Sequence, residues 1–265
     1  ALAASDAIEP EFDQRENPYI RGRLGVQRAH ALAANGRIVE AIHQLNQLVS
    51  DIPSNTSSGL PGDIASLYAK LSLGAGDYAA AARDANVAVA TLTTVDEQYE
   101  RARAWRVLVL ALQADGQSKD AITQLEKFAE WQRTTARPAP TLYAALARAE
   151  HARAEQRTAD AWREYATALD IAERWAVPAD IATVVVPYGN ALIAKGKLKQ
   201  ASEVIGRVAR WADHDFDSAL LQARLYSAIG QRSSAETAMA RARSLAGERT
   251  VPALLSVPTP KGIDQ

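Results

Sequence analysis

The chain has 265 residues, with 30 Lys and Arg against 31 Asp and Glu, no cysteine and an aromatic content of 6%. Nucleic-acid-binding proteins carry a basic excess, so we expect this region to bind no nucleic acid. The lack of cysteine excludes disulfides, thiolate metal sites and cysteine nucleophiles. No apolar run reaches the roughly 18 residues of a membrane span, so we expect no membrane insertion by this region.

Apolar residues recur at three- and four-residue spacing along most of the chain, which predicts amphipathic helices. The predicted helices cover 20–35, 38–50, 62–75, 78–92, 96–115, 118–132, 141–155, 158–176, 181–195, 198–212, 216–229 and 232–246. Loops are predicted at 50–63, 133–140 and 210–217, the first two being rich in proline. Pro53 is expected to end the first helix pair, because proline cannot continue a helix.

A glycine followed five residues later by alanine recurs along the chain. The pairs are Gly36/Ala41, Gly76/Ala81, Gly116/Ala121, Gly196/Ala201 and Gly230/Ala235. The first three glycines stand 40 residues apart, the next gap is 80, and the last is 34. The missing marker falls at Gln156, where Ala161 keeps the alanine. Such a period indicates stacked helix pairs, with a left-handed residue ending each first helix.

These units resemble the tetratricopeptide repeat (TPR). The second unit has Tyr68-Ala69, then Gly76-Asp77-Tyr78 and Ala81, which matches the family's small residue, its glycine and aromatic at the turn, and its alanine early in the second helix. The resemblance implies an all-α, right-handed superhelical solenoid of about six TPR-like helix pairs over 19–247. Residues 1–18 are interpreted as an N-terminal linker and 248–265 as a proline-containing C-terminal tail. The units of about 40 residues exceed the family's usual 34 and are similar to the repeats of bacterial signalling and transcription regulators.

Catalytic and metal-binding motifs are not found, so we expect no enzyme activity, no catalytic residue, no metal and no cofactor. The sequence has no phosphate loop, no Gly-x-Ser-x-Gly and no His-Glu-x-x-His. The carboxylates around His214, from Asp213 to Asp217, open like a calcium loop, but Ser218 and Arg224 stand where that loop needs Gly and Glu. We instead expect Asp215 or Asp217 to cap the next helix.

Aromatic and apolar residues near the helix ends are interpreted as packing residues. Trp105 occupies a core position of its repeat. Trp131, Trp175 and Trp211 lie near the ends of second helices, where packing between pairs explains them better than base stacking. Terminal helices of solenoids often pair, so the last helix, with Met239 and Leu245, is a candidate dimer surface.

The TPR resemblance also implies a binding groove. In the family the first helices line it, through positions 13, 10, 6 and 3 before the marker. At these positions the cations are Arg23, Lys70, Arg103, Arg106, Arg153 and Arg224, and the acids are Asp63, Glu150 and Asp217. Asn190 stands where the family often uses asparagine to bind a peptide backbone, while Leu110, Leu146 and Val186 are expected to be exposed apolar contacts. Arg103 and Arg106 are expected to grip a partner carboxylate together. Val26 and His30 replace the family's lysine and asparagine clamp, which argues against a chaperone tail as ligand.

These observations favour a non-catalytic scaffold that binds another protein or a peptide segment, acidic in part, in its groove. The chain begins Ala1-Leu2-Ala3 and is interpreted as an excised or mature part of a larger bacterial regulator, of which it would be the sensory or docking region. Two alternatives stay open: a small-ligand sensor and an envelope assembly factor. The compartment stays open as well, because a soluble periplasmic or cytoplasmic region fits the composition.

Overall fold

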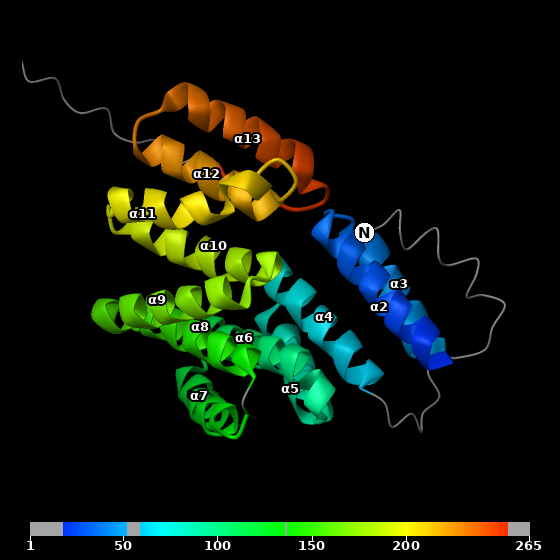
Figure 1. Ribbon diagram of the computed structural model, residues 1–265. Coiled ribbons are helices and arrows are strands. Elements are labelled where there is room, and N and C mark those ends of the chain that lie inside the picture. The colour runs from blue at the N-terminus through cyan, green and yellow to red at the C-terminus, as the bar shows by residue number, and fades with distance from the viewer. Residues whose placement is uncertain (1–17, 52–58, 136, 254–265) are drawn as a thin grey trace, which may run out of the picture. The chain divides into compact units, whose positions relative to one another are not determined.

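The computed structural model describes residues 18–51, 59–135 and 137–253, and these are almost entirely helical (Figure 1). The chain divides into an N-terminal unit, residues 1–175, and a C-terminal unit, residues 176–265. The N-terminal unit holds α2 (Pro18–Ala34), α3 (Ile38–Asp51), α4 (Leu60–Ala75), α5 (Tyr78–Thr91), the 3₁₀ turn η1 (Val95–Glu97), α6 (Gln98–Ala114), α7 (Ser118–Arg133), α8 (Pro138–Ala154) and α9 (Thr158–Trp175). The C-terminal unit holds α10 (Pro178–Ala194), α11 (Leu198–Ile205), the 3₁₀ helix η2 (Gly206–Trp211), α12 (Phe216–Ala228) and α13 (Arg232–Ala246). No strand occurs in these ranges, so the predicted all-α repeat of stacked helix pairs is confirmed.

The turn markers take the backbone conformation that the period predicts. The five marker glycines have φ between 67° and 81°, in the left-handed region. Gln156, the marker of the fourth repeat, also has a positive φ of 58° although it carries a side chain. The six marker alanines are all buried, which lets the second helix of each pair approach the first. The 40-residue period therefore continues through the repeat that lacks its glycine.

Replacing Gln156 by glycine is expected to stabilise the protein by about 1 kcal/mol, because a side chain in the left-handed region costs about 1–2 kcal/mol and glycine loses part of that gain to its freer unfolded chain. Urea unfolding of Gln156→Gly against the wild type measures this. Gln156→Ala is the control, since alanine keeps a Cβ and should bring no gain. Equal stability of the glycine and alanine variants would contradict the prediction.

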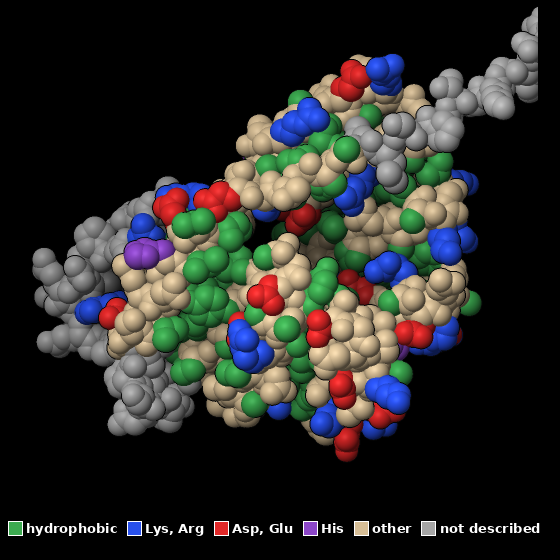
Figure 2. Space-filling view, turned by 180° about the vertical axis from the view of Figure 1, so that it is seen from behind, with side chains coloured by type: hydrophobic (Ala, Val, Ile, Leu, Met, Phe, Trp, Pro, Cys, Tyr) green, Lys and Arg blue, Asp and Glu red, His purple; other side chains and the backbone are tan. Residues whose placement is uncertain are grey.

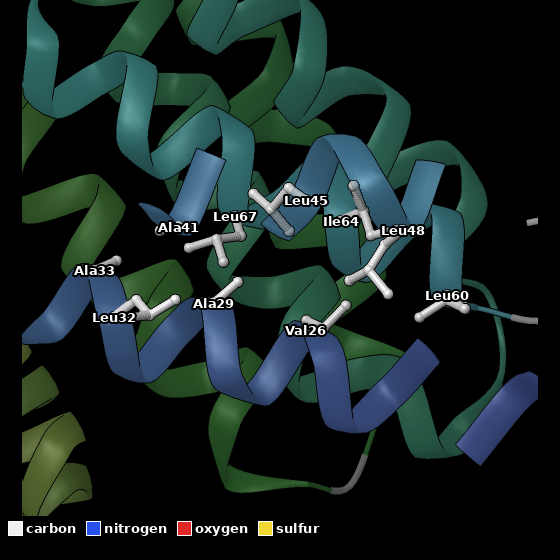
Figure 3. Packing of buried hydrophobic residues seen from close by; sticks show 10 residues of the cluster. All are labelled: Val26, Ala29, Leu32, Ala33, Ala41, Leu45, Leu48, Leu60, Ile64 and Leu67. Atoms are coloured by element: carbon white, nitrogen blue, oxygen red, sulfur yellow. The ribbon is translucent and has the colours of Figure 1, made fainter. Parts of the chain in front are cut away.

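The first core cluster of the N-terminal unit joins its first three helices. Figure 3 shows the buried side chains of α2, α3 and α4 pointing toward one another. Leu45 of α3 and Leu67 of α4 are completely buried there, and Ala29 of α2 allows the helices to approach closely. Spacings of three and four residues therefore place one apolar face of each helix in a shared core, as predicted.

Helix boundaries differ from the prediction mainly at prolines. Pro138 and Pro178 begin α8 and α10, three residues before the predicted starts. Proline is well suited to the first helical position because the missing N–H has no partner there. Because Pro138 begins a helix, the predicted loop 133–140 is too long. Helix α4 likewise begins at Leu60, two residues before its predicted start, with a proline in its first turn. The expected role of Pro53 lies outside the described residues.

The predicted helix 198–212 is divided. Its first part is α11, which ends at Ile205, and from Gly206 the chain continues as the 3₁₀ helix η2. Glycine is a poor helix former, which fits a change to tighter turns at this residue. Asp215 follows, and its side chain accepts a hydrogen bond from the Ser218 amide at 2.8 Å. The expected helix cap is therefore confirmed at Asp215.

Two expectations about the helix ends are corrected. Met239 is buried in the core of the C-terminal unit against Phe216 and Ala242, so it cannot form the predicted dimer surface. Trp105 is buried as predicted, and its ring stacks on Phe128 with centroids 5.1 Å apart. Trp175, in contrast, is 41% exposed rather than packed between helix pairs.

Candidate functional site: the inner face of the first helices

The first helices of successive pairs form a continuous row in the N-terminal unit. Helix α2 packs on α4, α4 on α6, and α6 on α8. In the same described part of the chain, the second helices α3, α5, α7 and α9 do not contact one another. A stack whose helices touch on one side and stand apart on the other curves toward the touching side. We call the surface of the first helices the inner face.

Titratable side chains from four helices gather on this face. They are Arg23 and His30 of α2, Asp63 and Lys70 of α4, Glu100, Arg103 and Arg106 of α6, and Glu150 and Arg153 of α8. His30 lies close enough to Lys70, Glu100 and Arg103 for their charges to affect its pKa. Residues up to 73 positions apart in the sequence therefore share one electrostatic environment.

Arg106 and Glu150 form a bidentate ion pair between α6 and α8. The guanidinium donates from Nε to Oε2 and from Nη2 to Oε1, both at 2.7 Å. The side chain of Glu150 is only 5% exposed and that of Arg106 18% exposed. Burial alone would lower the pKa of Arg106, but the Glu150 carboxylate outweighs burial and raises it. The pair joins two neighbouring repeats.

Arg103 is paired within its own helix. Its Nη1 donates to Glu100 Oε1 at 2.8 Å, and its guanidinium lies 5.5 Å from the ring centre of Tyr99. Burial lowers the pKa of Arg103, and the nearby Glu100 carboxylate more than compensates, so the pKa is raised. Arg103 and Arg106 were expected to bind a partner carboxylate together, but each already binds a carboxylate of the chain itself. The prediction that both guanidiniums are available to a partner is therefore corrected.

Two titratable groups of the inner face have strongly shifted pKa values. Burial lowers the pKa of His30 to about 4; Glu100 opposes this, while Arg103 and Lys70 add to it. Burial also raises the pKa of the Asp63 carboxyl to about 6, with Arg23 opposing and Glu100 and Glu97 adding to the rise. His30 is therefore neutral at neutral pH, and Asp63 is a carboxylate held at a cost.

The position ten residues before the marker is mostly buried. Among the six repeats this holds for Val26, Ser66, Leu146 and Leu220, whereas Arg106 and Val186 are half-buried. Leu146 is 0% exposed, because α8 packs against α6, α7 and α9. The expectation of an exposed apolar contact is thus wrong for Leu146, while Leu110 and Val186 stay partly accessible.

In the C-terminal unit, Arg224 and Asn190 bind each other. Arg224 Nη1 donates to Asn190 Oδ1 at 2.7 Å, and Asn190 Nδ2 donates to the Val186 carbonyl at 2.9 Å. Burial lowers the pKa of Arg224, and Asp217 opposes that shift. The asparagine expected to bind a peptide backbone therefore has both ends of its amide engaged within the unit.

The sequence placed the cations correctly at the first-helix positions but missed their partners. Glu150, an acid at one of the groove positions, is the carboxylate that Arg106 holds. The Arg103–Glu100 pair had a signal that could have found it, because the two residues are three apart on a helix. The Arg106–Glu150 pair spans 44 residues and has no local signal.

The described ranges were also searched for metal sites, membrane-spanning helices and basic patches. No group of three or more His, Asp or Glu residues there could hold a metal ion. None of the helices described there is both long and apolar enough to cross a membrane. On the face shown in Figure 2, Lys and Arg side chains lie beside Asp and Glu side chains rather than in one basic patch. The charge pattern of that face is mixed.

Comparison with known proteins identifies the fold. No protein-family model and no curated protein sequence matches the chain. Among solved structures, it is similar to the crystal structure of Rap protein complexed with competence and sporulation factor, with a TM-score of 0.71 and 14% sequence identity. The match covers 92% of this chain and 70% of that chain. The chain therefore has a TPR-like helical repeat fold, and an identity this low shows the fold alone.

Proposed function

We propose that the protein is a non-catalytic scaffold that binds an acidic segment of another protein along its inner face. One observation carries the proposal: two acids of this face are buried while three of its cations are exposed, and its half-buried Glu100 is paired with Arg103. Asp63 and Glu150 are 8% and 5% exposed, while Arg23, Lys70 and Arg153 are exposed. An approaching chain meets a positive surface, which favours carboxylates.

The similarity in fold supports this proposal. The Rap protein was solved in a complex with competence and sporulation factor, so a related repeat fold holds a partner. Function does not follow from fold, and the inner face carries the argument here. We propose further that this chain belongs to the TPR family and serves as the docking region of a larger bacterial regulator, as its long repeats indicate.

The paired arginines give the inner face a defined shape. Arg106 joins α6 to α8 through Glu150, and this pair holds the helix that carries the exposed Arg153 against α6. A preorganised surface loses less conformational entropy when a partner binds. Arg106 and Arg103 then position the face, while Lys70 and Arg153 contact the partner.

The test uses the exposed cations, because replacing Arg106 would disturb the fold. Lys70→Glu/Arg153→Glu is compared as bait with Lys119→Glu/Lys127→Glu, which makes the same charge change at two exposed positions of the second helix α7. Proteins captured from extract of the source cell by the wild type should fall at least tenfold on the first bait and be unchanged on the second. A photo-crosslinking amino acid in place of Lys70, but not of Lys127, should bond to the same protein. Equal capture by both baits would place the interface elsewhere.

A further inference from the structure

A hollow of about 380 Å³ lies in the N-terminal unit, and none of the inner-face charges is among its lining residues. Thr135 and Arg137, the first turn of α8 and the last turn of α9 line it. All of its lining residues belong to the N-terminal unit. Its volume lies within the range of ligand pockets, about 300–1,000 Å³.

Two guanidiniums line the hollow, and neither is firmly held. Arg174 pairs with Asp170, with side chains 72% and 66% exposed. Arg137 approaches Asp96 only to 3.7 Å, and that carboxylate is almost fully exposed. Exposed pairs of this kind contribute little to stability, in contrast to the buried pair of Arg106. A ligand carboxylate can therefore replace these partners at small cost.

Apolar and hydroxyl groups complete the lining. Trp175 is 41% exposed and supplies most of the apolar surface, while Ile171, one helical turn before it, lines the hollow but is only 8% exposed. Thr135 and Thr141 add two hydroxyls. Tryptophan and arginine are both enriched among the residues that contribute most to binding at protein interfaces. The lining therefore matches a ligand that is anionic at one end and apolar at the other.

Helix ends do not decide the charge of the hollow. The first turn of α8 contributes positive potential and the last turn of α9 negative potential, and both meet here. The preference for an anion thus comes from Arg137 and Arg174. Because these side chains are long and exposed, they suit a chain segment that reaches into an open hollow.

We propose that this hollow is a second binding site, independent of the inner face, which takes a peptide segment carrying a carboxylate next to an apolar side chain. The carboxylate binds Arg174 and Arg137, and the apolar side chain packs on Trp175 and Ile171. The proposal does not depend on the function proposed for the inner face.

The experiment follows the indole N–H signal of Trp175 by NMR, identified through its loss in Trp175→Phe. The probes are acetyl-Gly-Leu with a free carboxylate, the same peptide as its amide, and inorganic phosphate. We expect the free peptide to shift the Trp175 signal saturably and the amide to bind at least tenfold more weakly. Arg174→Gln should weaken the free peptide at least tenfold. Arg163→Gln, at another exposed arginine of α9 outside the hollow, should leave binding unchanged.

Each other outcome overturns the proposal. Equal binding of the amide would remove the role of the carboxylate, and unchanged binding by Arg174→Gln would remove the role of the guanidinium. Phosphate that binds as tightly as the peptide would make the hollow a general anion site. If none of the three probes shifts the Trp175 signal saturably, the hollow binds no such ligand. Melting curves of Arg174→Gln and Arg163→Gln establish that both fold like the wild type.

Discussion

Replacing Glu150 by alanine is expected to destabilise the N-terminal unit by about 3 kcal/mol, because it leaves the Arg106 guanidinium in a site with little access to water and without its carboxylate. Urea unfolding in a Trp211→Phe background measures this loss. Trp211 is the tryptophan of the C-terminal unit, so the remaining four report on the N-terminal unit alone. A loss below about 1 kcal/mol would contradict the role of the pair.

The double variant Arg106→Leu/Glu150→Leu distinguishes the cost of an unpaired buried charge from the contribution of the ion pair itself. Removing both charges leaves no unpaired group, and such replacements are often neutral or stabilising. We expect it to recover most of the stability that Glu150→Ala loses. Asp170→Asn is the matched control, because Asp170 pairs with Arg174 on the surface of the same unit, with side chains 66% and 72% exposed. It should change stability by no measurable amount.

A period in the sequence is enough to predict the fold, because each repeat is specified locally. A marker at fixed distance ends each first helix, and Gln156 adopts the same backbone conformation because the two helices around it are fixed by their own apolar faces. Helix starts at Pro138 and Pro178 were missed because proline favours both a loop and a first helical turn. The residues next to each proline fit both a loop and a helix start, and packing against the neighbouring helices decides between them.

The candidate site was less predictable for a physical reason. A repeat pattern places Arg106 and Glu150 each on a first helix, but whether they meet depends on how α6 packs against α8. Leu146 shows the same limit, since an apolar residue at a groove position becomes core when neighbours surround its helix. Sequence therefore predicts which face a residue occupies, while burial and pairing are properties of the stack.

Stability between pH 7.5 and pH 4 is expected to depend on two opposing groups of the inner face. The pKa of His30 is lowered from 6.5 to about 4 by burial, so the folded state resists its protonation. Its contribution is fully present above pH 6.5 and is lost as the pH falls to about 4, by about 3 kcal/mol. The pKa of Asp63 is raised from 3.8 to about 6 by burial. Its ionisation therefore costs stability as the pH rises through that range, by about 3 kcal/mol in total.

Single substitutions should reveal the separate contributions of His30 and Asp63 to the pH dependence of stability. His30→Gln is neutral at every pH, so its stability relative to the wild type should rise by about 3 kcal/mol as the pH falls from 7.5 to 4. Asp63→Asn removes a carboxylate that is held at a cost, so it should exceed the wild type by about 3 kcal/mol at pH 7.5 and equal it near pH 4. Denaturant unfolding across this range measures both slopes, and His43→Gln, at an exposed histidine of α3, is the control for losing a histidine.

The two slopes have opposite signs because burial disfavours the charged form of either group. Burial penalises the imidazolium at low pH and the carboxylate at high pH. The groups occupy neighbouring first helices and both sense Glu100, so the inner face keeps nearly constant stability where each group alone would vary. Parallel slopes for His30→Gln and Asp63→Asn would show that a shared structural loss, rather than their separate protonation, sets the response. Opposite slopes would establish that the cost of buried charge is balanced across the face that we propose to bind the partner.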